Sequence, residues 1–117
     1  MQAKKILIFS DEKVMPNIIG NILSVEIKSE FKILITTDNF QQEAEKYEPN
    51  LIIVTSFHRA NLIPEFKASK KTKDIPIVLL SGVLSQEEAE SYEADAFLSK
   101  PVDIKILLLT VKDILHK

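Results

Sequence analysis

The chain of 117 residues has no cysteine, only two glycines and no long uninterrupted apolar run. Without cysteine it has no disulfide framework and no thiolate chemistry, which fits the cytoplasm. The apolar run after residues 1–5 is too short for a signal-peptide core or a membrane span. No Gly/Pro/Ser-rich linker or repeat divides the chain. We therefore expect one cytoplasmic domain over residues 1–117, without a membrane segment.

An excess of charge of either sign is also missing, since 15 Lys and Arg face 17 Asp and Glu, for a net charge of -2. Nucleic-acid binders usually carry a basic excess, so we expect no direct contact with DNA or RNA. The cluster of Lys70, Lys71 and Lys73 fits a solvated loop better than a phosphate-binding patch. Hydrophobic residues at 45% and charged residues at 27% are typical of a globular domain.

Five short apolar bursts alternate with amphipathic stretches. The bursts are nearly continuous and rich in β-branched residues, as in strands covered on both faces of a parallel sheet. They span residues 6–9, 31–35, 51–54, 75–80 and 96–98. The stretches between them have helical spacing, and alternation of this kind predicts βαβ crossovers. The sequence therefore predicts an α/β fold: a doubly wound, five-stranded parallel sheet with helices on both faces.

Each expected helix has its own signal. Helical spacing relates Val14, Ile18 and Ile22, with Ile19 and Leu23 beside them, and later Phe40, Ala44 and Tyr47. Pro64 suits the first position of a third helix, where its missing N–H costs nothing. A short fourth helix is expected over 87–92, and the last and clearest over about 102–115.

Sites in such sheets lie at the carboxyl ends of the strands. The strand ends to inspect are residues 10–12, 55–58, 81–82 and 99–101.

Taken in order, these strand ends resemble the receiver domain of two-component response regulators over essentially the whole chain. The segments that carry the resemblance are Lys-Ile-Leu-Ile-Phe-Ser-Asp-Glu (5–12), Pro-Asn-Leu-Ile-Ile-Val-Thr (49–55), Ile-Pro-Ile-Val-Leu-Leu-Ser-Gly (75–82) and Ala-Asp-Ala-Phe-Leu-Ser-Lys-Pro (94–101). The resemblance implies a flavodoxin-like (βα)5 fold. It also implies that Phe97 is the switch aromatic and that the bond before Pro101 is cis.

Two residues depart from the receiver pattern. Ser10 stands in place of the first acidic residue and Thr55 in place of the phosphoacceptor aspartate, so Asp11 is the carboxylate that remains. Mg²⁺ needs near-octahedral oxygen ligation, and one carboxylate is a poor site for it. A threonine hydroxyl, unlike a carboxylate, needs an adjacent base to act as a nucleophile. We expect a degenerate pocket of Ser10, Asp11, Thr55, Ser81 and Lys100, with no catalysis, no cofactor and no metal beyond a weak ion at Asp11.

Within this pocket we expect Lys100 to pair with Asp11 in place of a metal-centred cluster. Asp11 is also a good N-cap residue for the first helix. Ser81 is expected to satisfy local backbone groups at its strand end.

The last helix carries two apolar sets. The larger set has the spacing of a core stripe: Ile104, Leu107, Leu108, Val111, Ile114 and Leu115. Val102, Ile106 and Leu109 fall on the opposite side. They are either scattered surface residues or an interface, and receivers use this region for dimers and downstream contacts. We expect a protein partner or a second copy to bind through the last helix and fifth strand, with Phe97 adding area if it points outward.

Three functional hypotheses remain. The first is a non-phosphorylated receiver-like module that acts through protein contacts in two-component or phosphorelay-type regulation. The second is sensing of phosphate or a small anion by Lys100, Ser81 and the amides after Thr55. The third, a flavodoxin-like enzyme or nucleotide binder, is the weakest because no Gly-rich phosphate loop is present. The sequence names neither partner nor pathway.

Overall fold

A computed structural model describes residues 3–35, 39–55 and 60–116. Its sheet has five parallel strands in the order β2-β1-β3-β4-β5. The strands are β1 (Lys4–Phe9), β2 (Ser29–Leu34), β3 (Leu51–Val54), β4 (Ile77–Ser81) and β5 (Ala96–Ser99). The α/β fold predicted from the alternation of apolar bursts and helical stretches is confirmed, with strand bounds that differ by at most two residues.

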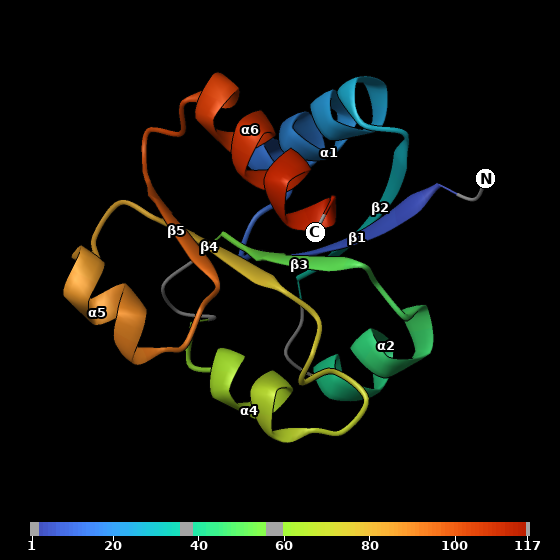
Figure 1. The fold of residues 1–117 in the computed structure, drawn as a ribbon, viewed down its shortest axis with the longest axis vertical. Helices are drawn as coiled ribbons and strands as arrows, with labels where there is room; N and C mark the ends of the chain where they lie inside the picture. The colour runs from blue at the N-terminus through green and yellow to red at the C-terminus, as the bar shows by residue number, and fades with distance from the viewer. Residues whose placement is uncertain (1–2, 36–38, 56–59, 117) are drawn as a thin grey trace.

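Helices cover both faces of the sheet (Figure 1). One face carries α1 (Val14–Glu26) and α6 (Ile104–Leu115). The other carries α2 (Phe40–Tyr47), α4 (Ile63–Ala68) and α5 (Gln86–Ser91). Pro64 lies in the first turn of α4, one position later than expected. The described residues include no helix of the length and apolarity needed to cross a membrane.

The side chains of each strand alternate between two hydrophobic cores. In β1, Leu7 and Phe9 pack with α2 and α4, whereas Ile6 and Ile8 pack with α1 and α6. All four residues of β3 are fully buried. Because neighbouring parallel strands are in register, with Phe9 opposite Val54, the residues that follow β1 and β3 emerge side by side.

The side of α1 that faces the sheet is not the one formed by Val14 and Ile18, the i, i+4 pair with which the predicted apolar series begins. Ile19 and Leu23 are buried, whereas Val14 and Ile18 are exposed. The helix has apolar residues on two sides, so spacing alone does not choose between them.

The last helix begins at Ile104, two residues later than expected. The carboxylate of Asp103 accepts hydrogen bonds from the backbone N–H groups of Lys105 (2.9 Å) and Ile106 (3.3 Å). This N-cap satisfies amides that have no partner within the helix. Val102 therefore lies before the helix and not on its outer face.

Candidate functional site

Four of the five residues predicted for the pocket lie at or just past the carboxyl ends of adjacent strands. Ser10 follows β1, Thr55 follows β3, Ser81 ends β4 and Lys100 follows β5. The N–H of Thr55 donates to the carbonyl of Phe9 (2.9 Å), and the N–H of Lys100 donates to the carbonyl of Ser81 (3.0 Å). These bonds extend the sheet by one residue and hold the strand ends together. Residues 56–58, which the sequence also placed at this edge, lie outside the described residues.

The hydroxyl groups of Ser10 and Thr55 are buried and engaged with the backbone. Ser10 Oγ accepts a hydrogen bond from the N–H of Glu12 (3.1 Å). Thr55 Oγ1 donates to the carbonyl of Phe9 (3.3 Å), and Thr55 is 2% exposed. Both hydroxyl groups are thus used in hydrogen bonds to the backbone of their own sheet edge.

Ser81 supports the turn that leaves β4. Its Oγ accepts hydrogen bonds from the N–H groups of Val83 and Leu84, each at 3.2 Å. The expectation that Ser81 satisfies local backbone groups is confirmed by these contacts.

Lys100 reaches across the strand ends to a backbone group. Its ammonium donates a hydrogen bond to the carbonyl oxygen of Thr55. The peptide bond between Lys100 and Pro101 is cis, as the resemblance predicts. The ion pairs that join described residues are Lys32–Glu43, Lys67–Asp95 and Lys71–Glu45, and the expected pair with Asp11 is not among them. The ammonium group of Lys100 instead donates to the carbonyl oxygen of Thr55, which lies at the same edge of the sheet.

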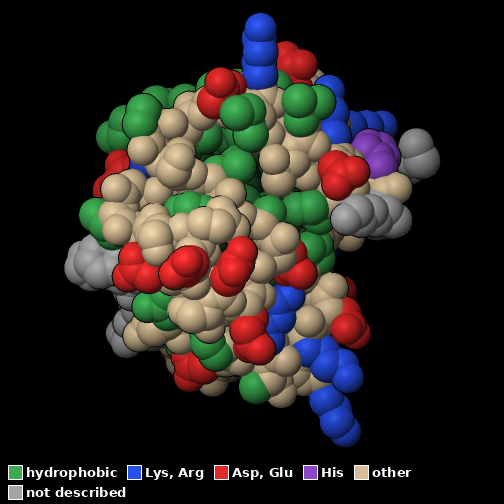
Figure 2. Space-filling model, turned by 60° about the vertical axis from the view of Figure 1, so that its left-hand side comes forward, with side chains coloured by type: hydrophobic (Ala, Val, Ile, Leu, Met, Phe, Trp, Pro, Cys, Tyr) green, Lys and Arg blue, Asp and Glu red, His purple; other side chains and the backbone are tan. Residues whose placement is uncertain are grey.

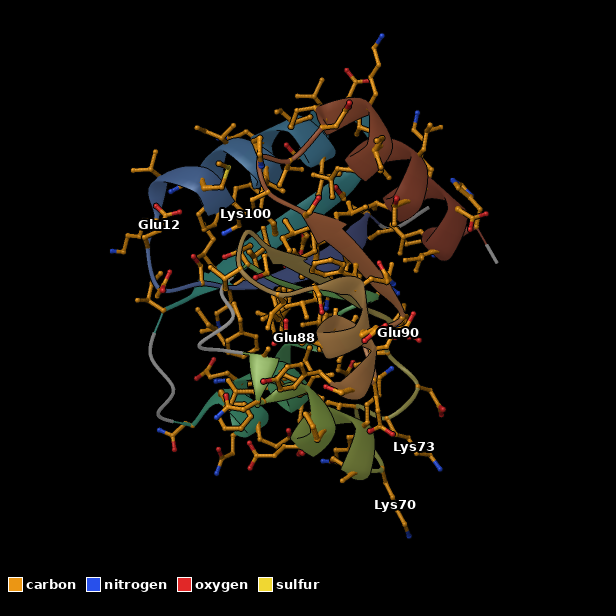
Figure 3. All side chains as sticks on the ribbon, turned by 90° about the vertical axis from the view of Figure 1, so that its left-hand side faces the viewer. Glu12, Lys70, Lys73, Glu88, Glu90 and Lys100 are labelled. Carbon is orange, nitrogen blue, oxygen red and sulfur yellow. The ribbon has the colours of Figure 1, made fainter. Side chains whose placement is uncertain are left out.

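Glu12, not Asp11, supplies the carboxylate that begins α1. Its two carboxylate oxygens accept from the N–H groups of Val14 (2.8 Å) and Met15 (3.1 Å). Figure 3 shows Glu12 and Lys100 at the same end of the sheet. The sequence favoured Asp11 for this role because aspartate, unlike glutamate, is a preferred N-cap residue.

The oxygen groups at this edge form a weak donor set for a cation. The Ser10 hydroxyl, the Thr55 hydroxyl and the Glu12 carboxylate are each engaged with the backbone. No group of three or more His, Cys, Asp or Glu side chains that could hold a metal ion occurs among the described residues. These three groups alone do not provide the near-octahedral oxygen ligation that Mg²⁺ prefers.

The predicted interface residues separate into two groups. Ile106 is 50% exposed and Leu109 is 68% exposed, so α6 does present an apolar outer face. Val102 and Phe97 are instead partly buried and pack against the two cores. Val102 precedes the helix, and Phe97 lies on the α2–α4–α5 side of β5. Neither belongs to the outer face of α6, which corrects the prediction.

Sequence reasoning missed a second exposed apolar stripe, on α1. Val14 and Val25 are 70% and 81% exposed, and Ile18 also faces solvent. These residues repeat at four and seven positions, so they share one side of the helix. The i, i+4 spacing was visible in the sequence, but a core role explained it equally well. Since α1 and α6 lie on the same face of the sheet, the two exposed stripes belong to one layer of the molecule (Figure 1).

No protein-family model and no curated protein sequence matches this chain. Solved structures do resemble it. A protein from Chloroflexus aurantiacus assigned as a response regulator superposes with a TM-score of 0.87 at 19% identity, covering 99% of this chain and 100% of that one. A response regulator receiver modulated diguanylate cyclase from Pelobacter carbinolicus gives a TM-score of 0.80 at 25% identity, with coverage of 97% and 92%.

A third similar structure is the receiver domain of a sensor histidine kinase from Pseudomonas aeruginosa, which holds a magnesium ion in its active-site cleft. It gives a TM-score of 0.84 at 16% identity, and covers 98% of this chain and 99% of that chain. At these identities the likeness establishes the flavodoxin-like receiver fold, with strand order 2-1-3-4-5.

Proposed function

We propose that this protein is a receiver-like signalling module of two-component or phosphorelay-type regulation that works through protein contacts without being phosphorylated. The observation that carries the proposal is the end of β3. The residue there is Thr55, whose hydroxyl is buried and bonded to the carbonyl of Phe9, while Lys100 is bonded to the carbonyl of Thr55 itself. The side chains of the pocket are therefore held in place by hydrogen bonds to backbone groups.

The partner contact is proposed to be the exposed face of α6 together with the edge strand β5. Ile106 and Leu109 offer apolar area there, and contiguous exposed apolar residues are typical of interaction sites. Helix α5, which contacts β5 from the other face of the sheet, has Glu87, Glu88 and Glu90, and acidic side chains gather on the side of the molecule that carries it (Figure 2). A partner with an apolar centre and a basic rim would be complementary. A second copy of this chain, bound through the same surface of α6 and β5, is the alternative partner.

Backbone NMR with Mg²⁺ and beryllofluoride tests the pocket part of this proposal. Beryllofluoride mimics a phosphoryl group on an aspartate, so the parent protein should show no saturable shifts at Asp11, Thr55 or Lys100. Saturable shifts there would overturn the proposal. Shifts produced by inorganic phosphate alone would instead favour the hypothesis of anion sensing.

A gain-of-function variant provides the matched control. Ser10→Asp combined with Thr55→Asp returns carboxylates to both departing positions beside Asp11. Three carboxylates give Mg²⁺ the oxygen ligands it requires, so this variant should bind Mg²⁺ and respond to beryllofluoride. If the folded variant shows no shifts with Mg²⁺ and beryllofluoride, the lack of shifts in the parent protein has a cause other than the missing carboxylates.

A further inference from the structure

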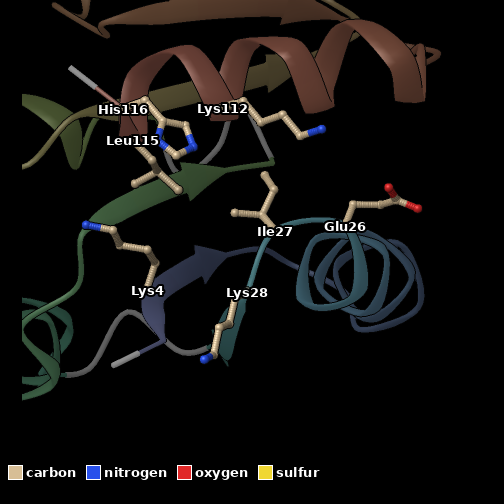
Figure 4. A pocket seen from close by; sticks show the side chains of 7 residues that line it. All are labelled: Lys4, Glu26, Ile27, Lys28, Lys112, Leu115 and His116. Carbon is tan, nitrogen blue, oxygen red and sulfur yellow. The ribbon is translucent and has the colours of Figure 1, made fainter. Parts of the chain in front are cut away.

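We propose that a basic groove at the amino-terminal edge of the sheet binds an acidic peptide segment that carries an apolar anchor residue. The groove has a volume of about 440 Å³ and lies between the last turn of α6, the end of α1 and the start of β1 (Figure 4). It is at the opposite end of the sheet from Ser10, Thr55 and Lys100. The proposal therefore does not depend on how the degenerate pocket works.

The floor of the groove is apolar. Ile27, which follows α1, is 8% exposed, and Leu115, in the last turn of α6, is partly buried. Both pack into the core under α1 and α6, so their positions are fixed before a ligand arrives. In Figure 4 the side chains of Leu115 and Ile27 line the groove from two sides. A preformed apolar floor suits one aliphatic or aromatic side chain.

The rim of the groove is basic. Lys4 and Lys28 lie on adjacent segments that are joined by a hydrogen bond from the N–H of Lys4 to the carbonyl of Lys28 (3.1 Å). Lys112 and His116 lie four residues apart on one side of the end of α6. Glu26 is the acidic residue of the lining, and its carboxylate points away from the floor (Figure 4).

No ion pair to a described carboxylate involves the three lysines of the rim. Within the described part of the chain, Lys4, Lys28 and Lys112 make no ion pair, whereas Lys32, Lys67 and Lys71 do. Lys112 lies in the last turn of α6, where a cation interacts well with the helix dipole, but Lys4 begins a strand and has no such role. The protein as a whole carries a net charge of -2, so the groove is a basic site on an acidic molecule.

Charge and floor together select the ligand class. A small anion would satisfy the lysines and leave the apolar floor unused, and a purely apolar ligand would leave three ammonium groups unused. An acidic segment with a central apolar residue uses both features, and its carboxylates complement the rim.

The test is fluorescence anisotropy of the 117-residue protein with a fluorescein-labelled peptide of sequence Glu-Asp-Leu-Phe-Glu-Asp. Saturable binding is expected, weakening as salt rises because the rim is exposed to solvent. Backbone NMR with the same peptide should shift Lys4, Ile27, Lys28 and residues 112–116. The peptide Glu-Asp-Gly-Ser-Glu-Asp keeps the charge, lacks the anchor and should bind at least about tenfold more weakly.

Paired charge reversals separate a specific groove from general attraction. Lys28→Glu with Lys112→Glu should weaken binding by about tenfold or more. Lys70→Glu with Lys73→Glu changes the net charge equally at exposed positions far from the groove, and should leave binding nearly unchanged (Figure 3). Circular dichroism of each variant verifies the fold.

Several results would overturn the proposal: no binding, equal loss in both double variants, or equal binding of the peptide without an anchor. Equal shifts from inorganic phosphate would make the groove a small-anion site. Binding of anionic lipid vesicles without binding of the peptide would make it a membrane contact.

Discussion

Ser10 and Thr55 sit at the ends of two adjacent buried strands, where a cluster of carboxylates would be costly without a cation. Like charges close together in a partly buried site raise one another's pKa and oppose ionisation. With hydroxyl groups at both positions, each polar atom is satisfied by a neighbouring backbone group. Lys100 then has a carbonyl oxygen as its partner.

The hydroxyl of Thr55 should therefore contribute to stability and not to reactivity. In Thr55→Val the bond to the carbonyl of Phe9 is lost, but that carbonyl still accepts from the N–H of Thr55. No buried acceptor is left unsatisfied, so we expect a loss of about 0.5–1.5 kcal/mol in the free energy of unfolding. Urea unfolding measures this, and a much larger loss would show that the hydroxyl organises more of the pocket than one hydrogen bond.

Glu43 gives a prediction about pH. The hydrogen bond from Lys32 (2.9 Å), and then its charge, lower the pKa of this exposed carboxyl. A lowered folded-state pKa stabilises the protein above the ordinary glutamate pKa, and this contribution is lost as pH falls through the folded value. Lys32→Met should raise the pKa of Glu43, measured by carboxyl NMR titration. Lys46→Met is the control, because its charge contributes least and should move the pKa less. Equal shifts would contradict this assignment.

At the scale of elements, α1 shows what apolar spacing can and cannot specify. Strands could be found in the sequence because all residues of β3 and β4 are buried and therefore read as continuous apolar runs. Helix α1 has Ile19 and Leu23 on its buried side and Val14 and Ile18 on its exposed side, so a helix was predictable but its orientation was not. Orientation depends on tertiary contacts with β1 and β2 that spacing does not encode.

The candidate site divides in the same way. The positions of Ser10, Thr55, Ser81 and Lys100 could be predicted because parallel strands end at one edge of the sheet. The hydrogen-bond partners could not be, since a long lysine side chain reaches several acceptors at that edge. Asp11 and Glu12 both carry carboxylates, and it is Glu12 whose carboxylate accepts from the first N–H groups of α1. The order of the strand ends in the sequence thus predicted where the site lies, whereas the hydrogen-bond partners of each side chain required the structure.

The contact between α1 and β2 yields a prediction at this scale. A Cβ at Gly20 would lie 2.4 Å from the ring of Phe31, closer than any real contact. Gly20→Ala gains about 1 kcal/mol in helix propensity, but it must displace a ring packed against the core. We expect overpacking to dominate, with a net loss of about 1–2 kcal/mol in urea unfolding.

Gly82→Ala is the matched control for Gly20→Ala. A Cβ there meets Lys100 Cβ at 3.4 Å, which is ordinary contact, and the backbone φ of Gly82 is not positive. Its effect on the free energy of unfolding should be within about 0.5 kcal/mol. If Gly20→Ala proves as neutral as this control, the ring of Phe31 has room to move and the close approach is not required.

Across the whole molecule, the parallel strands all run the same way, so the sheet has an amino-terminal end and a carboxyl-terminal end with different side chains. The carboxyl-terminal end has the satisfied pocket around Thr55, and the amino-terminal end has the basic groove around Ile27. Between them, on one face of the sheet, α1 and α6 expose apolar residues to solvent. Because the groove is lined by the ends of α1 and α6, a partner that covers the whole α1–α6 layer would border the groove, whereas the pocket around Thr55 lies at the other end of the sheet.

The outer face of α6 is the surface on which the proposed function depends. Ile106→Lys with Leu109→Glu places opposite charges on exposed positions, so the net charge and the core of Leu107 and Val111 are unchanged. The fold should remain intact, while self-association or binding of a partner is abolished. Burying the two new charges in the centre of an interface would cost desolvation free energy. Analytical ultracentrifugation measures the oligomeric state, and NMR shows whether the core spectrum is kept.

The exposed stripe of α1 provides the comparison for this double variant. Val14→Lys with Ile18→Glu makes the same charge change on the neighbouring helix, at residues that are also exposed. An interface restricted to α6 and β5 predicts that only the α6 variant dissociates the complex. Loss of association in both variants would extend the interface across the whole α1–α6 layer. A complex unaffected by the α6 variant would place the interface elsewhere, most directly on α1 if the second variant alone dissociates it.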